Sequence, residues 1–273
     1  MTDFIIGNTA AIRLAFFLGV FGLMALWELI APRRPLGVSK PVRWYTNLGL
    51  VSIDSVLSRV LIPAQAIGVA VFVEGRGVGI LNALPLPQWT AILFGVVALD
   101  FVIYLQHAMF HAIPAFWRFH MVHHTDLDVD TTTGVRFHPV EILLSMGIKM
   151  GAVAVVGAPV VAVVVFEVLL NVTSMFNHGN VRLEKRLDEV LRFLVVTPEM
   201  HRVHHSVIGK EHNSNFGFNL PWWDRLLGTY RAQPEAGHEG MAIGLGPFRD
   251  SKALTLPRLL ILPFTKRPGK AMY

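Results

Sequence analysis

Four apolar runs, separated by shorter polar stretches, dominate the pattern of hydrophobic and polar positions in this sequence. A helix that crosses a bilayer needs about 20 mainly apolar residues. The first three runs, residues 14–30, 44–73 and 89–104, therefore each predict one membrane span. The second run carries two charges in its first half, and charge is costly inside a bilayer. We therefore expect its helix to begin along the membrane surface and to enter the bilayer near Val56.

The fourth run, residues 142–170, is longer than one straight span requires and contains Gly157-Ala-Pro159 near its middle. Glycine commonly ends helices and proline interrupts them, so this run predicts a helical hairpin that enters and leaves the membrane on one side. Residues 181–196 are basic and amphipathic, which predicts an interfacial helix. Residues 256–264 are apolar but too short to span, and we expect them to lie on the membrane.

The positive charges that follow the first run predict the orientation of these elements. They are Arg33, Arg34, Lys40 and Arg43. Loops rich in Lys and Arg stay in the cytoplasm. The chain is therefore predicted to be an all-α integral membrane protein of about three spans plus a helical hairpin. A histidine-rich helical cap and the C-terminus would lie on the cytoplasmic face, with the N-terminus on the other side.

The composition agrees with a membrane protein. Of the 273 residues, 53% are hydrophobic and 16% are charged, with a mean hydropathy of +0.49; ordinary soluble domains carry about 25% charged residues. The net charge of +5 would suggest nucleic acid as the partner of a soluble protein. Here the positive-inside rule and anionic lipid headgroups explain it, so we expect no nucleic-acid partner. The sequence has no cysteine, which excludes disulfides, thiolate zinc sites and cysteine-ligated iron–sulfur clusters.

Eight of the 12 histidines gather in the motifs HAMFH, HMVHH and HRVHH. Residues three or four apart share a helical face, so each motif predicts a face that presents imidazoles to one place. Neutral imidazole binds Zn, Cu, Fe and Ni, and eight imidazoles exceed the four ligands of one structural zinc ion. The motifs therefore predict two metal ions. The eight residues are His107, His111, His120, His123, His124, His201, His204 and His205.

Two polar residues precede the first motif on the same predicted helical face, Asp100 and Tyr104. A carboxylate in this position can orient a ligand imidazole, here that of His107, which makes both residues candidates for the site. The alternative is that Asp100 only makes a buried polar contact with another helix.

Two other classes of metalloprotein remain as alternatives. A zinc hydrolase needs three ligands, an open position and a general base, and a metal transporter holds its ligands at mid-membrane on discontinuous helices. Eight clustered imidazoles in polar, aromatic segments just outside the spans argue against both.

The three motifs resemble the histidine boxes of the fatty acid hydroxylase superfamily. This superfamily covers membrane-bound di-iron oxygenases such as sterol desaturases, fatty acid hydroxylases and alkylglycerol monooxygenases. RFHPVE at 136–141 and NSNFGFNLPWWDRLLGTY at 213–230 also resemble family motifs. On this basis we divide the chain into N-terminal membrane helices at 1–88, a catalytic domain at 89–231 and a C-terminal tail at 232–273.

The resemblance implies two iron ions that activate O₂ for hydroxylation or desaturation of a membrane lipid. It also implies a further ligand, His178, which family members often accompany with a second histidine four residues earlier. That earlier position is Ser174 here, so Asn171 or Asn177 is considered in its place. His138 in RFHPVE is expected to line the site and is a weaker candidate for a metal ligand.

The chemistry implied by the resemblance requires an external source of electrons, because this sequence has no dinucleotide-binding glycine fingerprint and no second domain for a flavin or haem. We expect an electron-donor protein such as a ferredoxin or a cytochrome, attracted by basic residues near the boxes. These residues are Arg118, Arg182, Lys185, Arg186, Arg192 and Arg202. The alternative is that these charges only contact lipid phosphates.

Overall fold

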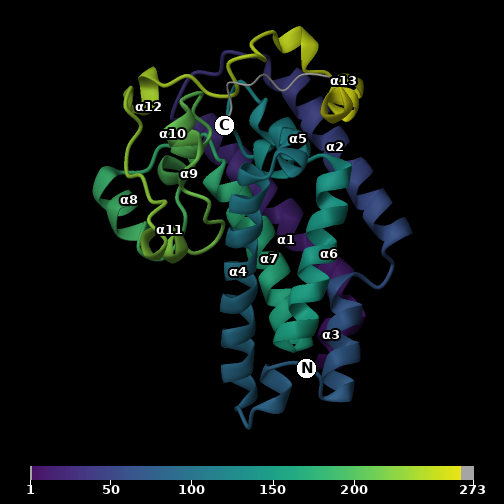
Figure 1. Cartoon of the computed structure of the whole chain (residues 1–273). Helices are drawn as coiled ribbons and strands as arrows, with labels where there is room; N and C mark the ends of the chain where they lie inside the picture. The colour runs from purple at the N-terminus through teal and green to yellow at the C-terminus, as the bar shows by residue number, and fades with distance from the viewer. Residues whose placement is uncertain (1, 266–273) are drawn as a thin grey trace.

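Long apolar helices stand side by side in the computed structural model and carry a cap of shorter helices at one end (Figure 1). The structure describes residues 2–265, and within this range it is all-helical, without a β-strand. Among residues 2–265, five segments are long and apolar enough to cross a membrane, which confirms the predicted fold class. They are α1 (Thr2–Ile30), α2 (Lys40–Leu61) continued by α3 (Gln65–Arg76), α4 (Gln88–Ala112), α6 (Pro139–Val156) and α7 (Val160–Asn177).

The predicted hairpin is confirmed, with its bend at residues 157–159. Gly157 ends α6 with φ 67°, a left-handed conformation that glycine adopts without a steric penalty. The bend packs closely on Gly79, where an added Cβ would lie 2.3 Å from the Gly157 Cα. The hairpin is thereby anchored at the end of the bundle away from the cap, and α7 returns the chain to the cap.

The second predicted span is broken at residues 62–64, between α2 and α3. Pro63 has no amide proton to continue the α2 ladder, which explains where the break falls. Small side chains let the helices pack closely around a core that includes Leu99 and Phe166. For example, a Cβ on Gly95 of α4 would lie 3.0 Å from the Cβ of Ala162 on α7.

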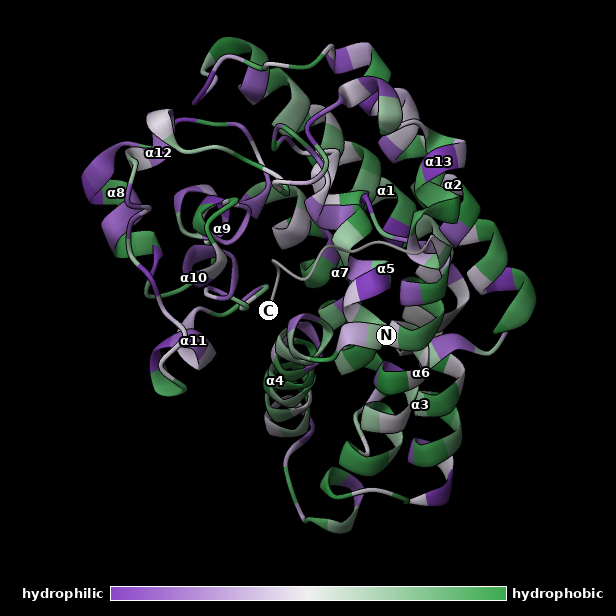
Figure 2. Ribbon diagram, turned by 45° about the horizontal axis from the view of Figure 1, so that its top comes forward, coloured by the Kyte–Doolittle hydropathy of each residue, from purple (hydrophilic) through white to green (hydrophobic). Residues whose placement is uncertain are grey.

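The cap consists of short helices that connect and cover the end of the bundle, with a mixture of hydrophilic and hydrophobic residues (Figure 2). The predicted interfacial helix forms over only seven residues, since α8 covers Lys185–Leu191. The other helices are α5 (Pro114–His124), α9 (Pro198–His204), α10 (Gly209–His212), α11 (Trp222–Leu226), α12 (Gly237–Gly240) and α13 (Leu256–Ile261). Single 3₁₀ turns lie at η1 (Leu81–Ala83), η2 (Thr133–Val135), η3 (Ser251–Ala253) and η4 (Leu262–Phe264).

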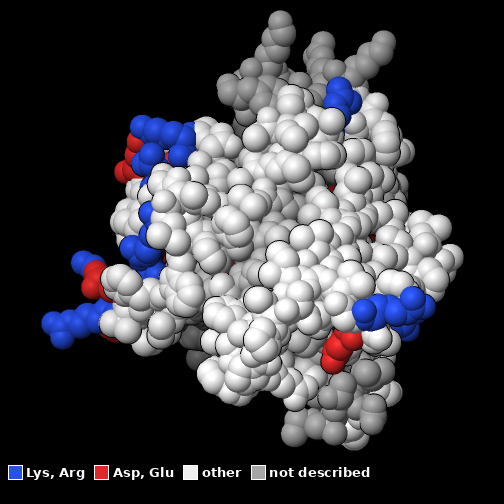
Figure 3. Space-filling view, turned by 60° about the horizontal axis from the view of Figure 1, so that its bottom comes forward, with Lys and Arg blue, Asp and Glu red and all other residues white. Residues whose placement is uncertain are grey.

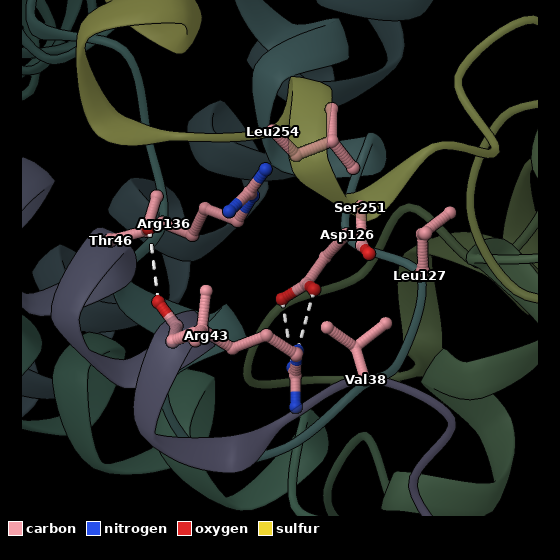
Figure 4. Close-up of a pocket in the computed structure, with 9 residues that line it drawn as sticks. Val38, Arg43, Thr46, Asp126, Leu127, Arg136, Ser251 and Leu254 are labelled. Atoms are coloured by element: carbon pink, nitrogen blue, oxygen red, sulfur yellow. Dashed lines mark hydrogen bonds and ion pairs between the residues drawn. The ribbon is translucent and has the colours of Figure 1, made fainter.

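A buried ion pair joins α2 to the polar loop at 125–133 (Figure 4). Arg43 contacts Asp126 at 2.7 Å and Asp130 at 2.6 Å, and all three side chains are at most 4% exposed. Burial alone would raise the pKa of Asp126, but the charges of Arg43 and Arg136 outweigh it and hold this pKa below its ordinary value. Arg43 is thus a buried residue that fixes the loop after α5.

Candidate metal centre

Two groups of buried histidines meet where the spans join the cap. Within each group the ligand nitrogens lie within 4.8 Å of one another. The first group comprises His107, His111, His120, His124 and His204. The second comprises His123, His178, His201 and His205. The structure therefore brings all nine predicted ligands together, in two groups.

Each histidine motif is positioned by a helix whose start or end is set locally. His107 and His111 lie one turn apart near the end of α4. Proline at the first position begins both α5 and α9, where a missing amide proton costs nothing. His178 directly follows α7, so the second helix of the hairpin places it in the second group. A single crossing would have left it at the opposite end of the bundle.

Backbone carbonyls determine which nitrogen of several rings is free. The Nδ1 atoms of His107, His123 and His178 lie 2.8, 3.1 and 2.7 Å from the carbonyl oxygens of Phe216, Arg136 and Ser174. A carbonyl oxygen only accepts, so each Nδ1 carries the proton and each Nε2 presents a lone pair. Holding one ring nitrogen in this way is typical of histidines that bind a metal with the other.

The unprotonated Nε2 atoms face one another at distances that fit a shared metal ion. His107 Nε2 lies 3.1 Å from His120 Nε2, and His123 Nε2 lies 3.1 Å from His178 Nε2. Two lone pairs repel at this distance unless a cation lies between them. Imidazole nitrogens bind zinc at about 2.1 Å, so two of them at a right angle around one ion would be about 3.0 Å apart. Each group therefore fits one metal ion.

Burial keeps these imidazoles neutral, as metal ligands must be. It lowers the pKa of His120, His123 and His124 well below the ordinary value, and neighbouring histidines lower it further. The same holds for His201, His204 and His205. Burial also lowers the pKa of His178, to about 3.

The expected contact between Asp100 and His107 is absent. The Asp100 carboxylate instead accepts from Trp223 Nε1 at 2.8 Å, and the Tyr104 hydroxyl lies 2.9 Å from Thr229 Oγ1. Both residues face the segment at 213–230, which also supplies the carbonyl of Phe216 to His107. Asp100 thus makes the buried polar contact that was the alternative, and both residues hold this segment against α4.

Three further expectations concern residues at the edge of the site. His138 caps α6 and its ring contacts Phe119 and Phe264, so the structure places it away from the two groups. Ser174 donates to the Gly134 carbonyl at 2.7 Å and belongs to neither histidine group. Asn171 and Asn177 donate to backbone carbonyls, of Glu167 and Phe218, and neither replaces the missing histidine.

Sequence reasoning missed two residues of the centre. Glu141 on α6 accepts from His120 Nδ1 at 2.6 Å and is 4% exposed. His212 is also buried, with its ring centroid 4.4 Å from that of His124 and 4.7 Å from that of His111. Neither of its nitrogens has a hydrogen-bond partner among residues 2–265. The signal for Glu141 was its place in RFHPVE, whereas His212 lies outside every histidine motif and only the fold reveals it.

The basic surface predicted near the boxes is smaller than expected. Arg192 and Arg202 are at most 4% exposed and pair with Asp188 and Glu199, so neither offers a free charge. Arg118 is partly buried and donates to the Pro263 carbonyl. The remaining residues, Arg182, Lys185 and Arg186, are exposed. Arg182 lies 3.9 Å from Glu239 and Lys185 lies 4.0 Å from Glu189.

Comparisons with known proteins agree with this geometry. The chain is 29% identical to the ornithine lipid hydroxylase OlsE of Rhizobium tropici over 157 residues, which cover 58% of this chain and 46% of that protein. It is 25% identical to the alkylglycerol monooxygenase of Homo sapiens over 60% of this chain and 35% of that protein. It is 28% identical to the very-long-chain aldehyde decarbonylase GL1-8 of Oryza sativa subsp. indica over 55% of this chain and 57% of that protein.

The matched segments thus span only about a third to just over half of these relatives' own lengths. No solved structure matches the chain significantly. The fatty acid hydroxylase model matches residues 92–229, from near the start of α4 to the end of the segment that faces it. This match covers half of the chain and includes every histidine of both groups. The chain therefore belongs to the fatty acid hydroxylase family.

Proposed function

We propose that this protein is a membrane-bound di-iron oxygenase that hydroxylates a lipid. The observation that carries the proposal is the pair of histidine groups, in which bare Nε2 atoms face one another at 3.0 to 3.1 Å. Donor sets made only of imidazole nitrogen also suit zinc and copper, so the choice of iron rests on the family. Bound iron would supply the oxidising power to break an unactivated C–H bond with O₂, which no side-chain acid or base can do.

The names of two relatives support a hydroxylated lipid as the product. One is an ornithine lipid hydroxylase and another is an alkylglycerol monooxygenase. The position of the centre agrees, because it lies where apolar spans meet the cap and not on the outer surface of the cap. Phe218 lies against the centre, with its ring centroid 5.2 Å from that of His107, and gives the site an apolar wall.

The residues of the chain would bind the metal ions and orient their imidazole ligands, whereas the electrons would come from another protein. The carbonyls of Phe216, Arg136 and Ser174 hold three imidazoles in one tautomer, and burial keeps the rings neutral. Inserting one atom of O₂ into a C–H bond and reducing the other atom to water consumes two electrons and two protons. We propose that a ferredoxin- or cytochrome-like protein delivers the electrons to the cap, where the basic side chains of Arg182, Lys185 and Arg186 are exposed.

Activity and iron content together test this function. We expect two irons per chain, and conversion of a lipid extract with ¹⁸O₂, a carrier and its reductase to give products that carry one ¹⁸O by mass spectrometry. His123→Ala and His204→Ala remove one ligand from each group and should abolish the product and lower the iron content. His238→Asn, which changes a buried histidine outside both groups, should leave the iron content unchanged. One zinc per chain and no ¹⁸O-labelled product would refute the proposal.

We also propose that the cap faces the cytoplasm, because Arg33, Arg34 and Lys40 follow α1 at the cap end of the bundle. The described chain begins at the opposite end and finishes at the cap (Figure 1). A single cysteine in place of exposed Lys210 of the cap tests this orientation, since the chain has no cysteine of its own. If an impermeant thiol reagent labelled this position in intact cells, the cap would face outwards and the proposed orientation would be wrong.

A further inference from the structure

Two segments of the cap that are distant in the sequence form one exposed apolar ridge, which we name the cap lip. One segment runs from α8 into the following turn, and the other comprises α11 and the next residue. Five large apolar side chains on the lip are between 53% and 73% exposed. They are Val190, Phe193, Leu194, Leu226 and Leu227. Contiguous apolar surface of this kind marks an interaction site.

Specific contacts hold the two segments of the lip together. Trp222 Nε1 donates to the carbonyl of Phe193 at 2.7 Å. Arg225 donates to the carbonyl of Arg192 at 3.2 Å, and its guanidinium lies 4.7 Å from the centroid of the Phe193 ring. The ridge is therefore a built surface, and not a set of side chains that are exposed independently.

The lip contacts the side of the span α4, at a point between the two ends of that helix. Trp223 Nε1 donates to Asp100 on α4 at 2.8 Å, and the Trp223 ring lies 4.7 Å from the ring of Phe101. Asp100 lies about 18 Å along α4 from Gln88 at about 1.5 Å per residue. A bilayer core is about 30 Å thick, so this attachment lies within the depth that α4 crosses. Figure 1 shows α8 and α11 beside the cap-side half of α4.

Charged residues are placed where lipid headgroups would be. Arg182, Lys185 and Arg186 are exposed, and they precede the apolar residues of the lip in the same segment. Glu239 lies 3.9 Å from Arg182 and Glu189 lies 4.0 Å from Lys185. When the end of the bundle away from the cap is brought forward, the face is almost free of charge and the charged side chains gather towards its edges (Figure 3). An apolar ridge bordered by Lys and Arg is the pattern of a surface that lies in an anionic membrane interface.

We propose that the cap lip is immersed in the same bilayer that the spans cross. The cap is then held to the membrane by a monotopic contact as well as by its connections to the helices. The segment at 213–230 runs from the lip to the histidines, since Phe216 accepts from His107. If the proposed function holds, a lipid therefore reaches the centre from the bilayer beside α4 without crossing water.

Depth-dependent fluorescence quenching tests the immersion and does not depend on activity. Single cysteines replace Phe193 or Leu226 and are labelled with an environment-sensitive dye, in nanodiscs of phosphatidylcholine and phosphatidylglycerol. Position 93 on α4, which is exposed on a span, is the positive control, and Lys210 on α10 is the negative control. Both lip positions are exposed, so the substitutions remove no buried side chain.

We expect lipids with a nitroxide on the acyl chain to quench the label at 193 and 226 as strongly as at 93, and iodide to quench only the label at 210. Iodide quenching at 226 without nitroxide quenching would overturn the proposal. If the labels at 193 and 226 became accessible to iodide when each nanodisc holds a single chain, the lip would be covered by a second copy of the protein. That result would also overturn the proposal. Loss of iron or of activity in the unlabelled protein would count against the proposed function and not against the immersion.

Discussion

Replacing Glu141 should weaken the metal centre without touching a ligand. This carboxylate accepts from His120 Nδ1 at 2.6 Å and is 4% exposed, so it fixes the tautomer and the orientation of a ring whose Nε2 lies 3.1 Å from those of His107 and His124. Glu141→Ala leaves a buried N–H donor without its partner, which costs about 1–3 kcal/mol. Glu141→Gln keeps an oxygen that can accept, and should lose less.

Loss of such a partner typically lowers metal affinity about 10- to 100-fold, or by about 1.4–2.8 kcal/mol at about 1.4 kcal/mol per factor of ten. We therefore expect the affinity to fall in the order wild type, Gln variant, Ala variant. The assay is competition with a chelator of known affinity, followed through the metal content of the protein. Glu74→Gln removes a carboxylate that accepts from Val160 at the far end of the bundle, and should leave the metal content unchanged. Equal affinities for wild type and both Glu141 variants would refute the orienting role.

Three further outcomes follow from the structure. His212→Ala should increase the loss of metal to a chelator, because it removes a buried imidazole beside His111 and His124, and added imidazole should reverse the effect; unchanged retention would mean that His212 only packs. Arg43→Ala should lower the free energy of unfolding by about 3–5 kcal/mol, since it leaves buried Asp126 without its partner, and an unshifted melting curve would contradict this. In the metal-free protein, folding holds the pKa values of His201, His204 and His205 below the unfolded value, so stability present above about pH 6.5 should be lost as the pH falls below it, by up to about 1.4 kcal/mol per group and pH unit. Equal melting temperatures of the metal-free protein at pH 7.5 and pH 5.5 would count against that assignment.

Some functional contacts could not be predicted because they join parts of the chain that local periodicity does not relate. The spacing of Asp100, Tyr104, His107 and His111 places them on one helical face, which the structure confirms. It does not identify what covers that face. Asp100 was paired with His107 because the two share this face, but the segment at 213–230 supplies hydrogen-bond partners for both. His212 was overlooked for the same reason, since it reaches the centre from α10, outside the three motifs.

The sequence by itself determined the elements, because these depend on local physics. Apolar runs of sufficient length predict spans, Gly157 and Pro159 bend the hairpin, and HxxHH spacing aligns imidazoles on one face. Only the tertiary structure decided how nine histidines divide into five and four, and that Glu141 holds His120. These contacts connect residues up to about a hundred positions apart, and their selection depends on which side chains can pack and satisfy their hydrogen bonds once the helices are assembled. Periodicity along the chain carries no information about that selection.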